Sequence, residues 1–426
     1  MSARADAIVI GGSVGGLAAA AYLRHAGLGV TVLEASEQLG GSARAAQAFH
    51  ALDPLMLRDL GLTRRGLKLA ARDLPLVGLR QDGRHLVLAR DPHVAARAIA
   101  AFSAADAQAY KHFHAELFAL ARALRPWWCE DAAVPQPKDR LALALARLEA
   151  TSANAWLGAW FETEALRAAL AFDAPFPDAP GSALALVWRA AQEMGGLQGA
   201  VAQIDGGGAA LAVLLTAAVQ ADGAELRTKA RVKKLLLADD EAAGVELDTG
   251  EQVFARRILS SLSRRDTLLS LAPTASAGIA ETLRLTEAAP ATQETEIVFT
   301  LNAAPQIPHA PARLVVTEGD ALEAIVTPSS SPGQHLLTVT ARGTPGDDAV
   351  IAGLERFAPQ LKSRIVAAER RTRDVLVPHL MESATARIST PIKGLTLCGR
   401  DAEPMAALSG RAGRLAAVIA AREKGA

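Results

Sequence analysis

The chain of 426 residues has little of several features that would narrow its function at once. Its 45 basic and 45 acidic side chains give a formal net charge of zero. This balance offers no electrostatic basis for binding nucleic acid or an acidic membrane surface. No uninterrupted apolar run reaches the roughly 18 residues of a membrane span, so we expect no transmembrane segment. Peripheral contact with a membrane through an apolar surface stays open, as does the oligomeric state.

Cysteine is also scarce. Cys129 and Cys398 are the only two and lie far apart in the chain. They form neither a CxxC pair nor a disulfide framework, which fits a reducing compartment. The first residues lead directly into an apparent strand, without the basic and apolar segments of a secretory leader. We therefore expect a cytoplasmic protein.

Motifs for metal and nucleophilic chemistry are missing as well. The nine histidines form no HExxH motif and no Cys/His metal spacing, so we expect no metal site. There is no G-x-S-x-G nucleophile elbow and no Walker lysine. No acid–base pair can be named, and the catalytic residues therefore stay unknown at this stage.

What the chain does contain is a glycine-rich N-terminal unit. Residues 6–10 read as a buried strand, 17–25 as an alanine-rich helix and 30–34 as a second strand. The turn after the first strand reads Gly11-Gly12-Ser13-Val14-Gly15-Gly16. Small residues let its backbone N–H groups approach a pyrophosphate, and the helix N-terminus favours anions. Glu34 ends the second strand, where a carboxylate can accept a hydrogen bond from a ribose hydroxyl. The spacing predicts a βαβ dinucleotide site.

Two details modify this prediction. Ser13 stands where the G-x-G-x-x-G pattern has its second glycine, and its hydroxyl could itself meet a phosphate. A second turn, Gly40-Gly41, follows six residues after Glu34, and Ser42 and Arg44 could add a hydroxyl and a cation. The alternative is a pair of glycine turns without any ligand. The combination of strand, helix and acid at the right spacing favours a bound dinucleotide.

The glycine turn, Glu34 and the E-x5-G-G spacing resemble the N-terminus of FAD-binding flavoproteins of the phytoene desaturase and amine oxidase superfamily. Residues 52–124 and 195–262 resemble its phytoene desaturase-like branch. Nicotinamide-dependent dehydrogenases do not usually carry the second glycine pair, so the resemblance selects FAD over NAD. The cofactor-binding residues that it implies are Gly11, Gly12, Ser13, Gly15, Gly16, Glu34, Ala35, Gly40, Gly41, Ser42, Arg44, Val232, Gly399, Asp401, Leu408 and Ser409.

The resemblance also implies an α/β fold with two parts. The first is a discontinuous, Rossmann-like FAD-binding domain of the GR2 type with a β-meander, over residues 1–70, 195–265 and 385–426. The second is an α+β substrate domain with helices and an antiparallel sheet, over residues 71–194 and 266–384.

The sequence pattern predicts most elements of these two parts. An Asp-Gly turn predicts a hairpin over residues 76–88. Helical periodicity and capping predict helices near 104–124, 141–148, 155–170, 182–194, 209–221, 347–358, 361–368 and 414–422. Alternation predicts a meander over 231–255 and an antiparallel sheet from 296–301, 313–317, 323–327 and 335–342, with a further strand around 370–373. The four tryptophans at 127, 128, 156 and 160 either line a pocket or pack between helices, and helix packing is favoured.

The C-terminal stretch departs from the family pattern. Where the family has histidine this chain has Glu403, and Met405, Ala406 and Ala407 replace three glycines. Two hypotheses therefore stay open. The first is an FAD-dependent oxidoreductase that removes hydride from a mostly apolar small molecule, as a desaturase or oxidase does. The second is a flavin-binding but non-catalytic or partner-dependent scaffold of the same fold. A flavin amine oxidase is disfavoured because no aromatic residue follows Phe357.

Overall fold

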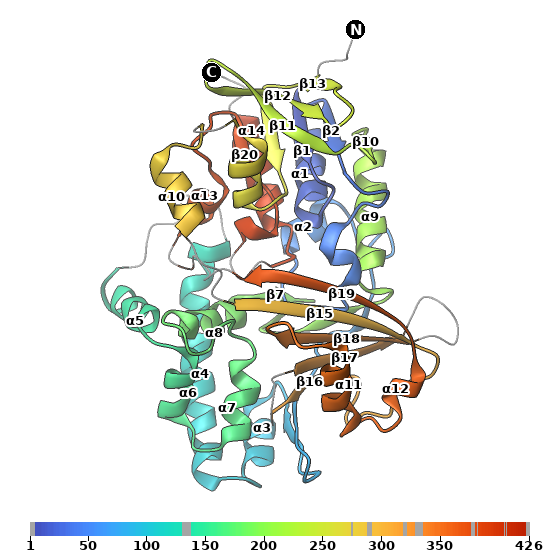
Figure 1. The fold of residues 1–426 in the computed structure, drawn as a ribbon. Helices are drawn as coiled ribbons and strands as arrows, with labels where there is room; N and C mark the ends of the chain where they lie inside the picture. Colours follow the sequence, from blue (N-terminus) through green and yellow to red (C-terminus); the bar gives the residue numbers. More distant parts are fainter. Residues whose placement is uncertain are drawn as a thin grey trace.

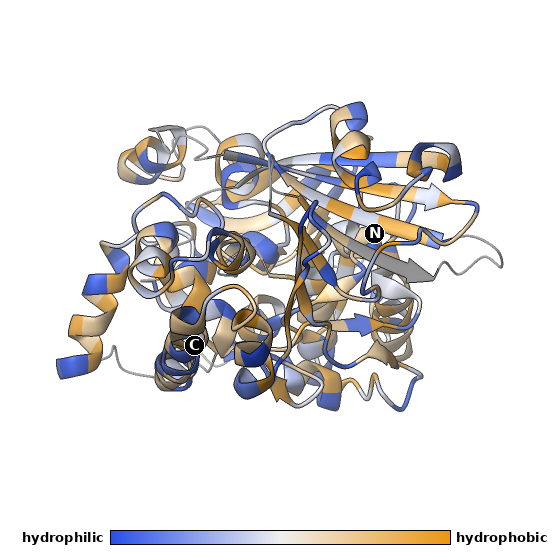
Figure 2. Cartoon of the chain, turned by 90° about the horizontal axis from the view of Figure 1, so that it is seen from below, coloured by the Kyte–Doolittle hydropathy of each residue, from blue (hydrophilic) through white to orange (hydrophobic). Residues whose placement is uncertain are grey.

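A computed structural model describes residues 5–129, 138–273, 276–287, 292–317, 322–328, 335–375, 380, 382–403, 405 and 407–422. The chain has a mixed α/β fold in which a parallel sheet lies in the upper part of the view in Figure 1, above a mainly antiparallel sheet that crosses its middle. Figure 2 shows mainly hydrophobic strands at the centre, and hydrophilic and hydrophobic residues alternating along the outer helices. Within the described residues, no helix combines the length and the apolar character needed to cross a bilayer.

The parallel sheet has five strands in the order β10-β2-β1-β14-β20. These strands are β1 (Ala7–Ile10), β2 (Val30–Leu33), β10 (Glu225–Arg227), β14 (Arg257–Ser260) and β20 (Leu395–Leu397). Every neighbouring pair runs parallel. β1 and β2 are buried along their whole length, which explains their continuous runs of aliphatic residues. Helices α1 (Val14–His25) and α14 (Arg411–Arg422) pack on this sheet, and α9 (Gly207–Ala221) packs against α1. The predicted βαβ unit is confirmed as β1-α1-β2.

Smaller sheets flank this Rossmann-like part. The predicted meander is confirmed as β11 (Val232–Ala238), β12 (Glu241–Leu247) and β13 (Gln252–Phe254). A second small sheet pairs β9 (Ala202–Ile204) with β3 (Ala48–Phe49) and β4 (Leu69–Ala71), and β7 (Glu193–Met194) pairs with β8 (Leu197–Gln198). Short helical segments here are η1 (Gly41–Ala45), α2 (Pro54–Asp59), η2 (Asp266–Leu271), α10 (Ile279–Glu287), α13 (Ala384–Ile388) and η3 (Arg400–Ala402).

The predicted hairpin and the predicted antiparallel sheet join into one sheet of seven strands, in the order β19-β15-β18-β17-β16-β5-β6. Its strands are β5 (Leu76–Leu79), β6 (Leu86–Leu88), β15 (Thr292–Leu301), β16 (Arg313–Val316), β17 (Leu322–Pro328), β18 (His335–Arg342) and β19 (Ile365–Val375). Only β16 and β5 pair in parallel. Helices α11 (Asp347–Glu355) and α12 (Leu361–Arg364) lie beside this sheet in Figure 1.

The remaining helices form a bundle whose core contains most of the tryptophans. They are α3 (Pro92–Ile99), α4 (Ala104–Cys129), α5 (Asp139–Glu149), α6 (Ala153–Trp160), α7 (Glu164–Ala171) and α8 (Ser182–Ala191). Trp127, Trp128 and Trp156 are at most 6% exposed, and the Trp128 indole donates to the Leu380 carbonyl over 2.9 Å. Packing between helices, which the sequence favoured, accounts for these three tryptophans. The predicted two-domain boundaries remain a proposal.

Several predicted helices are wrong in extent, among them the one expected over 347–358, which ends at Glu355. The helix expected to end near residue 124 runs to Cys129 with Pro126 inside it. The helix expected over 155–170 is two helices, α6 and α7, because Asp106 accepts hydrogen bonds from the N–H groups of Glu162 and Thr163 at 3.0 and 2.7 Å. The helix expected over 182–194 ends at Ala191, and 193–194 form a strand. The helix expected over 361–368 ends at Arg364, because the following residues pair with β15.

Candidate functional site

The two glycine turns meet at the N-terminus of α1. The Gly40 N–H donates to the Gly12 carbonyl over 2.6 Å, and Ser13 and Gly40 form a parallel bridge. Gly11, Gly40 and Gly41 all have positive φ angles, of +86°, +111° and +54°. L side chains rarely adopt such angles, so glycine is needed for this backbone path. The structure therefore brings the two predicted motifs, 29 residues apart in the chain, to one place.

Glu34 lies beside this double turn. Its Oε2 accepts from the Gly12 N–H over 2.8 Å, and its Oε1 accepts from the Ser36 N–H over 2.8 Å. These bonds hold the carboxylate at the end of β2, next to half-buried Ala35. A carboxylate oriented in this way can accept a further hydrogen bond from a ribose hydroxyl, because each oxygen has two lone pairs.

Ser13 caps α1. Its Oγ accepts from the Gly16 N–H over 3.2 Å, and its backbone is extended, as is typical of an N-cap. The first turn of a helix leaves N–H groups without intrahelical partners, and the serine hydroxyl satisfies one of them. The hydroxyl thus has a structural role in addition to the phosphate contact predicted for it.

Several glycines of the site are required by the protein's own backbone. A Cβ added to Gly15 would lie 1.9 Å from the Cys398 carbonyl oxygen, and one on Gly413 would lie 2.0 Å from the Gly15 carbonyl oxygen. At Gly399 the corresponding contact is the Ser261 carbonyl oxygen at 2.1 Å. Helices α1 and α14 and the end of β20 therefore pack backbone against backbone, whether or not a ligand is bound.

The other predicted residues surround these turns at different depths. Ser42 accepts from Nη1 of Arg400 over 3.2 Å, which links the second glycine turn to the segment after β20. Arg44 donates from Nη1 to the Leu39 carbonyl over 3.4 Å and folds back over Gly40. Asp401 is exposed, Leu408 is half-buried and Ser409 is fully buried.

Val232 lies apart from the turns, at the start of the meander. It is 9% exposed and packs in the apolar cluster that includes Leu33. Leu33 is the last residue of β2 and immediately precedes Glu34, so Val232 lies near the end of β2 that carries Glu34. The resemblance assigns Val232 a backbone contact with adenine, and that assignment stays a prediction.

The C-terminal end of the site contains a contact that the sequence did not reveal. The Glu403 carboxylate accepts from the Ala412 N–H at 3.1 Å through Oε1, and from the Ser409 hydroxyl through Oε2. Ser409 Oγ in turn accepts from the Arg411 N–H over 3.0 Å. Glu403 is 7% exposed, and this burial raises the pKa of its carboxyl group. The first turn of α14 is therefore capped by an acid of the chain itself.

Near this cap, Met405 has a φ of +59°, a left-handed conformation that L residues with side chains rarely adopt. Ala407 is 2% exposed and packs in the core of the helical bundle. Ala406 lies outside the described residues. The methionine thus keeps a backbone conformation suited to glycine, at a position where the family pattern has glycine.

A buried ion pair ties this end of the site to α2. Nε of Arg414 donates to Oδ2 of Asp53 over 2.5 Å, and the two side chains are 6% and 3% exposed. The Asp53 N–H donates to the Ser409 carbonyl over 2.9 Å, and its Oδ1 caps α2 at the Leu55 N–H. No local sequence pattern predicts this pair, whose members are 361 residues apart.

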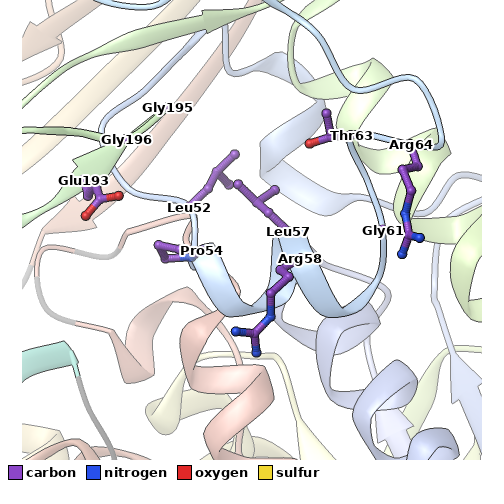
Figure 3. A pocket seen from close by; sticks show the side chains of 10 residues that line it. All are labelled: Leu52, Pro54, Leu57, Arg58, Gly61, Thr63, Arg64, Glu193, Gly195 and Gly196. Atoms are coloured by element: carbon purple, nitrogen blue, oxygen red, sulfur yellow. The ribbon is translucent and has the colours of Figure 1, made fainter.

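An open cleft of about 410 Å³ lies between α2 and the β7-β8 hairpin. Figure 3 shows the Leu52 and Leu57 side chains pointing toward its centre, with Arg58 and Arg64 at the rim. Its other lining residues are Pro54, Gly61, Thr63, Glu193, Gly195 and Gly196. The volume lies within the usual range for small-molecule pockets, and the floor is apolar.

The residues that surround the double turn fit a dinucleotide. The turn combines a backbone that only glycine can follow, a helix N-terminus and a carboxylate held beside it. At the other end the fit to a flavin ring is altered, because Glu403 already accepts from one N–H of α14, that of Ala412. Among the described residues, no group of three or more His, Cys, Asp or Glu side chains has a metal-binding arrangement.

Comparison with known proteins supports the same assignment. Residues 9–58 match the family model of the NAD(P)-binding Rossmann-like domain. The rat pyridine nucleotide-disulfide oxidoreductase domain-containing protein 2 is 32% identical over 63% of this chain and 55% of its own length, so the match spans just over half of that relative. The mouse protein of the same name is 27% identical over 98% of this chain and 93% of its own length. Hydroxyneurosporene desaturase of Cereibacter sphaeroides is 31% identical over 59% of this chain and 55% of its own length.

Among solved structures, a putrescine oxidase with putrescine bound has a TM-score of 0.68. It is 16% identical and covers 99% of each chain. This likeness concerns the fold. The resemblance predicted from the sequence is confirmed: the chain resembles the desaturase-like proteins in sequence, and the amine oxidases are among its structural neighbours.

Proposed function

We propose that the chain is an FAD-dependent oxidoreductase that removes hydride from a mostly apolar small molecule. One observation carries this proposal: the two glycine turns meet at the N-terminus of α1, beside a carboxylate held at 2.8 Å from the Gly12 N–H. The desaturase and oxidase relatives support a redox reaction, and the second glycine turn favours FAD over a nicotinamide cofactor.

In this proposal the chain's own residues bind and orient. The double turn and the α1 N-terminus hold the pyrophosphate through backbone N–H groups, and Glu34 holds a ribose. Val232 contacts the adenine, and the segment from Gly399 to Ser409 lies along the other end of the cofactor. FAD supplies the hydride acceptor when bound, and the protein supplies orientation and exclusion of water.

The apolar cleft of Figure 3 is our candidate for the substrate entrance. It opens between α2, in the proposed FAD-binding domain, and residues 193–196, where the chain returns to that domain. Leu52 and Leu57 would contact an apolar substrate there, and Arg58 and Arg64 would face its solvent end.

The visible spectrum of the purified protein tests the cofactor assignment. We expect a yellow protein whose flavin absorption bleaches with dithionite and returns in air. A colourless protein that takes up no added FAD would overturn the proposal. A screen of apolar alcohols, amines and polyenes under air then reports turnover as hydrogen peroxide or as a change in the substrate's spectrum.

The specific observation that favours a second candidate is the Glu403 cap. A carboxylate at the start of α14 already uses the Ala412 N–H, a donor that a flavin ring would otherwise use. A flavin-binding scaffold without its own turnover would account for this arrangement. Flavin that is bound but not reduced by any substrate in the screen, although dithionite reduces it, favours the scaffold over the enzyme.

A further inference from the structure

A buried ion network joins α8 to the seven-stranded sheet. Arg313 on β16 donates from Nη2 to Oδ1 of Asp173 over 2.6 Å, and from Nε to Oε1 of Glu323 over 2.5 Å. Arg189 on α8 also faces Asp173, with its Nε 3.7 Å from Oδ1. The side chains of both arginines are 8% exposed. The four charges balance, but the two arginines are bonded very differently.

Arg313 is held on two sides, whereas Arg189 is not. The contact between Arg189 and Asp173 is too long for a hydrogen bond. Within the described residues, Nη1 of Arg189 is buried and has no hydrogen-bond partner. Burial lowers the pKa of Arg189 to about 10, since the Asp173 charge offsets only part of the cost of desolvation. A buried cation with an unused donor is costly and calls for an acceptor that the folded chain does not supply.

The residue that precedes Arg189 on α8 carries a second unused donor. Nε1 of Trp188 is also buried without a partner in the part of the chain that the structure describes. The two sites are connected through neighbours: the His50 ring lies edge-on to Trp188, with centroids 5.8 Å apart, and His50 also helps to lower the pKa of Asp173. Indole and guanidinium N–H groups can only donate, so both nitrogens need the same kind of partner.

We propose that Arg189 and Trp188 bind a carboxylate group of the substrate. This inference rests on the proposed function, because it names the head group of that function's substrate. A carboxylate offers two acceptor oxygens and a charge, which match one guanidinium and one indole donor. The substrate class is then an apolar molecule with an acidic head, such as an aliphatic carboxylic acid.

The cleft of Figure 3 is bounded by continuations of the same two segments. The segment that carries His50 continues into Leu52 and Leu57, which form the apolar floor. The segment that carries Trp188 and Arg189 continues into 193–196 on the opposite side of the cleft. The unused donors and the walls of the cleft therefore belong to the same two segments of the chain.

Binding of octanoate, compared with the uncharged octanamide, tests the proposal without requiring turnover. Isothermal titration of the purified protein should show at least about a tenfold preference for octanoate. Arg189→Met should remove about tenfold of the octanoate affinity and leave octanamide binding unchanged. Trp188→Phe should weaken octanoate binding by a smaller factor, since one of the two donors remains.

Arg342→Met is the matched control. Arg342 donates from Nη2 to the carbonyls of Ala171 and Ala174, on either side of Asp173, so this variant removes a nearby positive charge that already has acceptors in the chain. It should keep the octanoate affinity of the parent protein. Equal affinity for octanoate and octanamide, or full octanoate affinity in Arg189→Met, would overturn the proposal and indicate that the unused donors bind water.

Two further measurements, of folding and of bound flavin, distinguish the possible reasons for a negative result. If circular dichroism shows that Arg189→Met does not fold, the preference of the parent protein and the loss in Trp188→Phe decide the matter. The visible spectrum of the same samples reports flavin separately. A colourless protein that prefers octanoate removes the proposed function and keeps the site, whereas a yellow protein without preference does the reverse.

Discussion

At each end of the candidate cofactor site a side chain caps the N-terminus of a helix, but the two caps differ in chemistry. At the N-terminal end, α1 is capped by the neutral hydroxyl of Ser13, which satisfies the N–H of Gly16. At the C-terminal end, α14 is capped by the carboxylate of Glu403, which accepts from the N–H of Ala412. A helix N-terminus favours a negative charge. The first end leaves its remaining N–H groups to a ligand, while the second already uses one of them for a group of the chain.

The glycines of the site also fall into two groups, which are required for different steric reasons. Gly40 and Gly41 are needed for a backbone turn with positive φ, which faces the predicted phosphate site. Gly15, Gly399 and Gly413 are needed because backbone atoms of other segments approach within about 2 Å of their missing Cβ atoms. Two groups of glycines thus serve one site, one by shaping the turn and the other by joining α1, β20 and α14 beneath it.

We expect the largest effect from a substitution that disrupts the backbone packing of α1 against the end of β20. Gly15→Ala places a methyl group 1.9 Å from the backbone oxygen of Cys398, where no flexible side chain can move aside. We expect the free energy of unfolding to fall by about 3 kcal/mol, the upper range for overpacking. Gly346→Ala is the control, since it has a φ of −66° and no atom within 4 Å of the added methyl. Urea unfolding followed by circular dichroism measures both, and equal stability of the two variants would contradict this packing.

The next effect concerns binding at the first end. Glu34→Gln keeps the shape of the side chain but removes the charge that lies beside Gly12. We expect FAD affinity to fall about tenfold, as a hydrogen bond to a charged group is lost. Glu37→Gln serves as the control because Glu37 is 74% exposed and pairs with Lys229. Fluorescence titration with FAD gives both affinities, and an unchanged affinity in Glu34→Gln would remove Glu34 from the site.

At the C-terminal end of the site, we expect the contribution of Glu403 to protein stability to depend on pH. Burial raises the pKa of Glu403 above its ordinary value of 4.5, so the folded state holds this proton more tightly than the unfolded state. The contribution of Glu403 to stability is therefore greatest below pH 4.5 and falls as the pH rises through the raised pKa. Relative to Glu403→Gln, the parent protein should lose stability as the pH rises above 4.5.

The control for this dependence is Glu281→Gln. Two arginine partners, Arg284 and Arg264, outweigh the effect of burial and lower the pKa of Glu281 to about 2. Its contribution is lost only as the pH falls below 4.5, so the slope above pH 4.5 should match that of the parent protein. Urea unfolding across this range is the measurement, and a slope unaltered by Glu403→Gln would contradict a buried, proton-binding cap.

We expect the smallest effect from substitutions of Ser13, which separate its role as a helix cap from a role in phosphate binding. Ser13→Ala should cost about 1 kcal/mol of stability through the lost cap, and Ser13→Gly only a few tenths. If the hydroxyl also binds phosphate, both variants lose FAD affinity. If the hydroxyl acts as a cap alone, Ser13→Gly binds FAD as the parent protein does. Urea unfolding and FAD titration of the two variants separate these roles.

Local features of the chain were predictable, and long-range contacts were not. The βαβ unit, the meander and the hairpin follow from periodicity and turn residues, which act over a few positions. The break between α6 and α7 depends on Asp106, more than fifty residues upstream, and the strand that begins at Ile365 depends on pairing with β15. No local pattern carries such information, since tertiary pairing overrides helix propensity.

The candidate site likewise contains residues that the sequence pattern predicts and residues whose roles depend on long-range packing. Glycine spacing and the acid after the second strand pointed to the double turn, and the structure brings these residues together. Glu403 was visible only as a departure from the family pattern, and its role as a cap depends on the position of α14. The ion pair of Asp53 with Arg414 and the unused donors of Arg189 and Trp188 arise from packing between distant segments, which no local sequence pattern encodes.

Competitive binding of FAD and NAD+ to the flavin-free protein tests the central claim most directly. The double turn with Glu34 predicts that one FAD binds per chain and that excess NAD+ does not displace it. Binding of NAD+ in preference to FAD, or of neither, would contradict the assignment of this N-terminal site to FAD.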